Sequence, residues 1–350
     1  MYIVNKKTRG IGGVDIIEGL LASMEKQFKE GNKNVLPDSF SYTSAIDAVS
    51  RLMDSGRRAE TIFQRMEDMG EHMPTTVVMN AVINAWAAGR VNRNTINRCL
   101  DILAYMVDQY TLGNMQIKPN TQSYNIVLKA ISQGRHDRLY CRQAVEILNR
   151  MEKLFKDGDS DVAPDVISYT TVISTFARST ARGKARAAER LMNEMIKSYR
   201  NGNTRANPNV FFFNAVFNAC AYTTSEVDKT DAVLVMISTL GILKEFTKPD
   251  HTSYGTMLQT VSKLIPVDDV RRDNFVITLF KQCCEDGQVG SMVLDQMVFA
   301  ASPSLYKTLV DKSLIGIDIP ASWSRNVKER KTTGTIKRKL KTKEKNQNVS

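Results

Sequence analysis

The chain has 350 residues, of which 42% are hydrophobic and 24% are charged, with a net charge of +11. No run of about 18 apolar residues occurs, which argues against membrane-spanning helices, and five scattered cysteines argue against a disulfide framework. From Arg325 onward, ten Lys/Arg and two Asp/Glu supply +8 of the charge. The body is therefore nearly balanced, which excludes a uniformly basic groove that grips a phosphate backbone.

Proline recurs at intervals of 37 to 45 residues and marks the start of a repeated unit. An aromatic residue or Met follows five residues later, then a small or polar residue, then aliphatic residues at helical spacing. A proline followed by Asp, Asn or Thr is typical of a helix start, because the next side chain can cap the helix. The six prolines are Pro37, Pro74, Pro119, Pro164, Pro208 and Pro249.

A second helical pattern lies between these prolines. A small or apolar residue is followed by apolar residues at +3, +4 and +7, which places all four on one helix face. Methionine at the last position suits an adaptable contact with the next repeat. The copies begin at Ile17, Ala59, Cys99, Ala144, Ala188 and, in a weaker form, Ala232.

Each unit thus predicts a helix A, a turn, a helix B and a second turn. One unit cannot bury its apolar faces alone, so we predict an all-α, right-handed α-α superhelical solenoid of helix-turn-helix repeats. We expect an N-terminal segment over 1–11 that is truncated in this sequence. A lone helix B and about six repeats follow over 12–265. Capping helices are expected over 266–322 (268–285, 289–301 and 304–314), and a basic disordered tail over 323–350.

Motifs for catalysis or metal binding are not found. Cys283 and Cys284 are explained by core contacts, and no CxxC pair, HxE motif or P-loop occurs. Asp268 and Asp269, near Asp273, predict a helix N-terminus rather than an acidic site. We therefore predict no enzyme, no metal site and no cofactor. The histidines lie in or near predicted turns without ligand spacing: His72, His136 and His251.

Several of these units resemble pentatricopeptide repeats. The segment PDSFSYTSAIDAVSRLMDSGRRAETIFQRMEDMG, residues 37–70, is similar in length to that family's unit of about 35 residues. PNTQSYNIVLKAIS from Pro119, PDVISYTTVIS from Pro164 and PNVFFFNAVFNAC from Pro208 resemble the family's helix A start. Most proline intervals exceed the family's unit, so the register between successive repeats is left open.

The resemblance implies that each repeat reads one base of single-stranded RNA with side chains on its concave face. The first reading residue follows the helix A aromatic, and the second follows the next proline. Asn donates and accepts whereas Asp only accepts, so Asn with Asp suits the N3–H of uracil. The implied target core is pyrimidine-U-A-U; Thr43 with Thr75 implies no base, and Gly255 has no side chain to read with. The implied pairs are Thr43 with Thr75, Asn80 with Asn120, Asn125 with Asp165, Thr170 with Asn209, and Asn214 with Asp250.

Residues three positions before each first reader are expected to flank the bases, where apolar side chains can stack. Gln122 and Thr252 stand at two of these positions and are poor stacking residues. The alternative is that the apolar members only fill the core between repeats. These members are Phe40, Val77, Ile167 and Phe211.

By the same resemblance we expect an RNA-binding protein of organellar RNA metabolism (stability, processing or translation) in mitochondria or the chloroplast. No targeting peptide is recognised in this N-terminus. Expected partners are single-stranded RNA and other RNA-processing or ribosomal proteins, with no membrane and a monomeric chain. The alternative is an α-solenoid scaffold for protein–protein interaction, which the balanced charge favours. The tail from Arg325 fits phosphate contacts as well as it fits a solvated charge run or a targeting signal.

Overall fold

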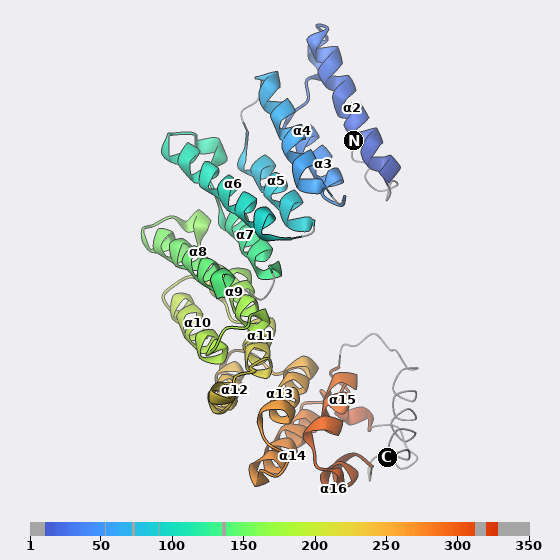
Figure 1. The fold of residues 1–350 in the computed structure, drawn as a ribbon, viewed down its shortest axis with the longest axis vertical. Helices are drawn as coiled ribbons and strands as arrows, with labels where there is room; N and C mark the ends of the chain where they lie inside the picture. Colours follow the sequence, from blue (N-terminus) through green and yellow to red (C-terminus); the bar gives the residue numbers. More distant parts are fainter. Residues whose placement is uncertain are drawn as a thin grey trace. The chain divides into compact units, whose positions relative to one another are not determined.

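The computed structural model describes residues 11–52, 54–71, 74–89, 91–134, 138–311 and 320–327 (Figure 1). Every regular element in these ranges is a helix or helical turn, which confirms the all-α prediction. The chain separates into two compact units, Met1–Ala181 with Met195–Asn207, and Arg182–Glu194 with Pro208–Ser350. His72, His136, the predicted N-terminal segment up to residue 10 and the tail beyond 327 lie outside the described residues.

The first unit is a stack of antiparallel helix pairs. Successive helices A are neighbours, and α3, α5 and α7 each also contact the helices B before and after them, so helix A is enclosed and helix B covers one side. The predicted lone helix B is α2 (Ile11–Lys29). The later helices are α3 (Ser39–Val49), α4 (Ser55–Met69), α5 (Thr76–Ala88), α6 (Arg93–Thr111), α7 (Thr121–Gln133), α8 (Arg138–Lys156) and α9 (Val166–Arg178).

The second unit continues the same alternation. The boundary between the units passes through α10 (Lys184–Arg200). In the C-terminal part, α15 contacts α13 as a further helix A would. A π-helical turn, Lys307–Asp311, follows the last helix. The helices are α11 (Val210–Ala221), α12 (Lys229–Phe246), α13 (His251–Leu264), α14 (Val270–Glu285), α15 (Ser291–Ala300) and α16 (Pro303–Tyr306).

The repeated apolar positions form the core of both units. The helix A aromatics Tyr42, Tyr124, Tyr169, Phe213 and Tyr254 are all buried. The last methionines of the helix B pattern are buried as well, as the adaptable contact predicted from sequence requires. They are Met66, Met106, Met151 and Met195.

The turns after α6 and α8 share one conformation. Gly113 and Gly158 have φ of 100° and 103°, a region open to glycine and strained for other residues. Asn114 and Asp159 follow them, and each side chain caps a short 3-10 turn. The extra residues of the long repeats lie partly in these turns and partly in longer helices, since α6 and α8 each have 19 residues where α4 has 15.

A buried cation closes the C-terminal end of the second unit. Arg272 of α14 is 5% exposed and donates to the carbonyl oxygens of Ile265 at 2.7 Å, Phe299 at 2.6 Å and Ala300 at 2.9 Å. These carbonyls end α13 and α15, where helix dipoles favour positive charge. One guanidinium therefore joins three helices.

Residues after position 320 also contact the C-terminal end of the second unit. The sequence pattern predicts that every residue from 323 onward belongs to the basic tail. The Trp323 ring meets the Phe280 ring edge-on at 5.7 Å, and the Trp323 carbonyl accepts from the Val289 N–H at 2.8 Å. Asn326 donates its N–H to the Gly287 carbonyl at 2.9 Å. The ordered cap therefore extends at least to Val327.

We expect Arg272→Ala to destabilise the second unit by about 2–4 kcal/mol, because it removes the guanidinium hydrogen bonds to two buried carbonyls and one partly buried carbonyl. The neighbouring Arg271→Ala is the matched control, since the exposed Arg271 side chain bonds the Asp269 carboxylate two residues earlier and no carbonyl of another helix among the described residues. Thermal unfolding of both variants measures the difference. Equal unfolding midpoints would show that the carbonyls do not depend on Arg272.

Candidate nucleic-acid interface

The residue directly after each repeat proline caps helix A, and the helix begins at the next residue. Each cap has extended backbone and accepts the backbone N–H three residues later, at 2.8 to 3.5 Å. Five of the caps are predicted second reading residues, so they are structural whether or not RNA is bound. The caps are Asp38, Thr75, Asn120, Asp165, Asn209 and Asp250.

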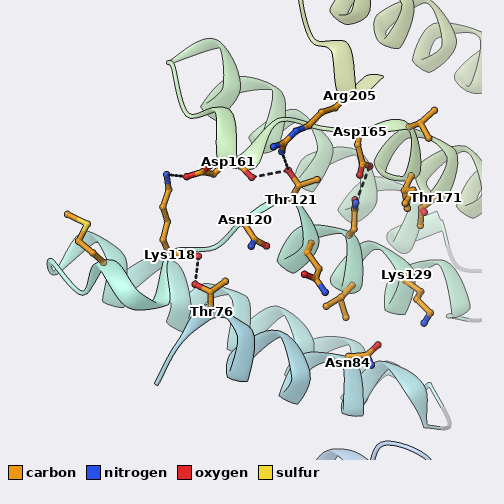
Figure 2. Close-up of a pocket in the computed structure, with 16 residues that line it drawn as sticks. Thr76, Asn84, Lys118, Asn120, Thr121, Lys129, Asp161, Asp165, Thr171 and Arg205 are labelled. Carbon is orange, nitrogen blue, oxygen red and sulfur yellow. Dashed lines mark hydrogen bonds and ion pairs between the residues drawn. The ribbon is translucent and has the colours of Figure 1, made fainter. Parts of the chain in front are cut away.

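Asn125 and Asp165 come together in the first unit. Asn125 Nδ2 donates to Asp165 Oδ1 at 3.0 Å, a bond drawn in Figure 2. The Ser168 hydroxyl lies 2.6 Å from Asn125 Oδ1 and 3.0 Å from Asp165 Oδ1. Because Asp165 Oδ1 also accepts the Ser168 N–H at 2.8 Å, that oxygen is fully engaged. The structure therefore brings a predicted pair to hydrogen-bond distance.

The same geometry recurs in the second unit. Asn214 Nδ2 donates to Asp250 Oδ1 at 3.1 Å, and the Ser253 hydroxyl lies 2.6 Å from Asn214 Oδ1. Of the two first reading residues, Asn125 is partly buried and Asn214 is only 6% exposed. The same three-residue arrangement therefore occurs once in each unit.

Asn80 and Asn120 also meet, with a different bonding pattern. Asn80 Nδ2 lies 3.4 Å from Asn120 Oδ1, and Asn80 is 4% exposed. Asn80 Oδ1 has no hydrogen-bond partner among the described residues. The Ser123 hydroxyl lies 3.2 Å from Asn120 Oδ1 instead. This pair is thus held more loosely than the two Asn–Asp pairs.

The threonine readers bond within their own helices. Thr43 donates to the Ser39 carbonyl at 2.7 Å, and Thr170 donates to the Val166 carbonyl at 2.6 Å. Within the described residues, Thr43 shares no hydrogen bond with its predicted partner Thr75. Thr170 and its predicted partner Asn209 belong to different units.

Gly255 has a steric reason to be glycine. A Cβ placed on it would lie 2.7 Å from Cγ of Met292. The first reading position of this repeat is thus filled by a core contact with α15, and it carries no reading side chain.

The apolar residues expected to flank the bases are exposed. Phe40 is 59%, Val77 63%, Ile167 57% and Phe211 72% exposed. The alternative that they fill the core between repeats is therefore wrong. They recur at one position of helix A and share a helix face with the first reader three residues later.

A groove of about 1060 Å³ lies along the first unit beside the Asn125–Asp165 pair (Figure 2). Its lining includes four predicted contact residues, Asn120, Asn125, Asp165 and Ile167. The charged lining is nearly balanced, with three cations against two carboxylates. These are Lys118, Lys129 and Arg205, and Asp161 and Asp165.

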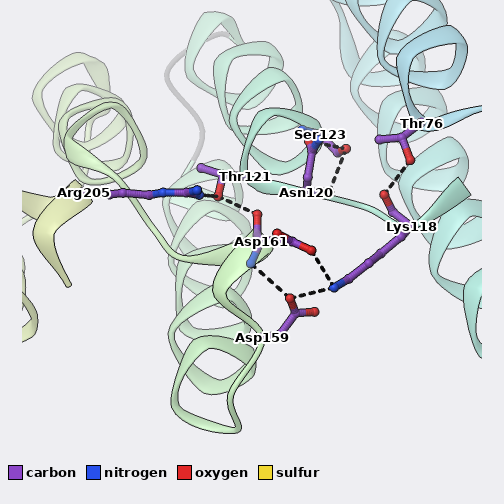
Figure 3. Close-up of polar contacts among 8 residues, drawn as sticks. All are labelled: Thr76, Lys118, Asn120, Thr121, Ser123, Asp159, Asp161 and Arg205. Carbon is purple, nitrogen blue, oxygen red and sulfur yellow. Dashed lines mark hydrogen bonds and ion pairs between the residues drawn. The ribbon is translucent and has the colours of Figure 1, made fainter. Parts of the chain in front are cut away.

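Ion pairs and hydroxyl contacts fix one edge of this groove, as Figure 3 shows. Lys118 Nζ lies 2.9 Å from Asp159 and 3.0 Å from Asp161, and these bonds raise the Lys118 pKa. The Thr121 hydroxyl lies 3.0 Å from the Asp161 carbonyl oxygen, and Arg205 donates to Thr121 Oγ1 at 3.5 Å. The turn of one repeat is thereby tied to helix A of the previous one.

Thr76 makes the equivalent contact one repeat earlier, with its hydroxyl 2.7 Å from the Lys118 carbonyl oxygen. These contacts set the register between successive repeats. They explain why Asn125 reaches Asp165 although Pro119 and Pro164 are 45 residues apart.

A family model of the pentatricopeptide repeat domain matches residues 153–222, which run from the C-terminal part of α8 to the end of α11. This segment of the chain is therefore similar to a pentatricopeptide repeat domain. A search of curated proteins found no match to the sequence.

The fold search matched solved structures of the pentatricopeptide repeat protein PPR10. The crystal structure of PPR10 from maize is 16% identical, with a TM-score of 0.46, over 90% of this chain and 46% of PPR10. PPR10 in complex with an 18-nt psaJ RNA element is 19% identical, with a TM-score of 0.37, over 88% of this chain and 47% of PPR10. The chain thus spans about half the length of the PPR10 structures.

Four of the five thiols are buried, and that of Cys284 is partly exposed. Burial raises the pKa of Cys99 and of Cys220 to about 12, so both are protonated at neutral pH. Cys283 is fully buried, in line with the core role predicted for it. In the described parts of the chain, no three His, Cys, Asp or Glu side chains gather as a metal site would require. None of the described helices is long and apolar enough to cross a membrane.

Sequence reasoning missed the serines that bond the first readers, and the threonines that tie one repeat to the next turn. Ser168 and Ser253 follow their capping Asp by three residues, and the Asp-x-x-Ser pattern of a capping box could have indicated them. Thr76 and Thr121 follow their caps directly and carry no comparable signal.

We expect Asp165→Ala to lower the free energy of unfolding by about 1–2 kcal/mol, because it removes the cap of α9. Asp165→Asn should change it by only a few tenths of a kcal/mol, since Asn caps a helix about as well as Asp. Denaturant unfolding of the two variants tests this. If both variants lose the same free energy of unfolding, Asp165 does not stabilise the protein by capping α9.

Proposed function

We propose that the protein binds single-stranded RNA and reads bases with paired side chains from successive pentatricopeptide repeats. The observation that supports this most is the Asn125–Asp165 pair, which joins two repeats by a 3.0 Å bond beside the groove. The exposed side chain of Ile167 lines the same groove. The Asn214–Asp250 pair repeats the bond in the second unit.

The bonding inside the Asn125–Asp165 pair leaves groups that suit uracil. Asp165 Oδ1 is engaged by the helix and by Asn125, so Oδ2 remains to accept the N3–H of a base. Asn125 retains a second N–H for a base carbonyl. Cytosine presents an acceptor at N3, which a carboxylate repels. The pair therefore favours uracil, as the family resemblance implies.

The remaining pairs give the proposed target its sequence. Asn80 with Asn120 accepts either pyrimidine, because an amide can donate or accept. Thr170 with Asn209 reads adenine by family resemblance, and Asn214 with Asp250 reads uracil. The target core is pyrimidine-U-A-U, read from the second repeat.

The exposed apolar residues stack against the bases on either side of each reader. The groove has nearly equal numbers of cations and carboxylates, so phosphate neutralisation contributes modestly and affinity depends weakly on salt. Base contacts then carry most of the selectivity.

The family resemblance further supports a role in organellar RNA metabolism, in mitochondria or plastids, through transcript stability, processing or translation. RNA-processing or ribosomal proteins would be partners of the bound RNA. The protein acts by binding, without a catalytic step of its own. A protein-interaction scaffold is the second candidate, because exposed Phe40, Val77, Ile167 and Phe211 would also suit a protein surface.

A random single-stranded RNA selection with the folded protein separates these candidates. We expect enrichment of pyrimidine-U-A-U. Asp165→Asn should keep the fold and reduce the preference for uracil over cytosine at one position, because an amide also accepts the cytosine pattern. Folded protein that enriches no sequence would favour the scaffold.

Stacking has its own test. Ile167→Ser should weaken RNA binding by about 1–3 kcal/mol whatever the base, with unchanged stability because the side chain is exposed. Leu112→Ser is the control, since Leu112 is 80% exposed and lies outside the groove lining. Fluorescence anisotropy with a labelled oligonucleotide measures both. Equal losses for the two variants would contradict a stacking role.

A further inference from the structure

We propose that Ser168 and Ser253 are positioning residues that orient the amides of Asn125 and Asn214, and so set the preference for uracil at these two sites. The specificity part of this inference rests on the proposed function. Neither serine is expected to touch the base.

Each serine is placed to fix one amide orientation. The hydroxyls of Ser168 and Ser253 lie 2.6 Å from Oδ1 of Asn125 and Asn214, closer than to the carboxylates at 3.0 and 2.9 Å. A hydroxyl has a single proton, and the shorter distance assigns it to the amide oxygen. The amide NH₂ is then directed at the Asp, which can only accept.

The fixed orientation of the amide determines which of its groups can bond the base. With Oδ1 held by serine and one N–H held by Asp, Asn125 can offer a base only its second N–H. A rotated amide would instead offer an oxygen, which suits the exocyclic amine of cytosine. The serine contact therefore excludes the rotated amide, which would weaken the preference for uracil over cytosine.

The chain contains a natural contrast. Ser123 holds the equivalent position in α7, is equally buried and belongs to the same kind of capping box. Its hydroxyl bonds Asn120 and not Asn80, whose Oδ1 has no partner among the described residues. The Asn80 amide also lies farther from its partner, at 3.4 Å. A serine at this position is thus insufficient alone; its hydroxyl must reach the reader.

One repeat supplies both the Asp and the Ser, three residues apart on one capped helix turn. The preceding repeat supplies the Asn. At the two Asn–Asp sites the unit of recognition is therefore three residues from two repeats. Val78 and Phe212 stand at the equivalent position of two other repeats and have no hydroxyl to offer.

Ser168→Ala and Ser123→Ala form a matched pair for testing this, since both lose the same capping-box hydroxyl. Binding is measured to oligonucleotides with uracil or cytosine at the base read by Asn125. We expect Ser168→Ala to reduce the uracil-over-cytosine ratio about three- to tenfold, roughly the effect of one hydrogen bond. Ser123→Ala should leave that ratio unchanged, and Ser253→Ala should act only at its own base. Equal ratios in Ser168→Ala and Ser123→Ala would overturn the proposal.

A second measurement needs no RNA. In protein labelled with ¹⁵N-asparagine, the Asn125 side-chain amide should exchange its hydrogens faster in Ser168→Ala than in Ser123→Ala. No change in that amide would overturn the orienting contact itself. If the amide responds but the wild-type protein shows no base preference, base reading fails and the specificity role fails with it, while the orienting contact stands.

Discussion

The capping side chain at the start of helix A accepts two kinds of hydrogen bond. In α9, Asp165 accepts the Ser168 N–H, which begins the helix, and the Asn125 amide from the previous repeat. A carboxylate near a helix N-terminus is stabilised by the exposed N–H groups there. The helix start and the link between repeats therefore depend on the same carboxylate oxygen.

The link requires the turns to hold successive repeats in register. Gly158 turns the chain after helix B, and a short 3-10 turn follows before the cap. Thr121 bonds that turn from the preceding helix A, and Lys118 bridges two of its carboxylates. The Asn and Asp therefore remain within 3.0 to 3.1 Å of each other at both sites, although the repeats are long.

Helix A contributes residues both to the core and to the surface of the protein. Its aromatic, such as Tyr169, is fully buried between neighbouring helices, while Ile167 two residues earlier is 57% exposed. A helix places these positions on different faces. An apolar residue left in water beside polar pairs, in a groove of balanced charge, suits a flat and weakly charged ligand surface such as a base.

The sequence by itself determined the helices and their buried positions, whereas the reading pairs were implied by the family resemblance. Proline with a capping residue, and apolar residues at helical spacing, are local signals, so the starts of helices A and the buried Tyr169 and Met151 followed from them. Only the tertiary structure decided that Asn125 meets Asp165 and that Ile167 stays exposed. Only it showed that Ser168 bonds Asn125 whereas Ser123 leaves Asn80 unbonded. These outcomes depend on how two repeats stack, and distances across a stack are not encoded in the spacing of either helix alone.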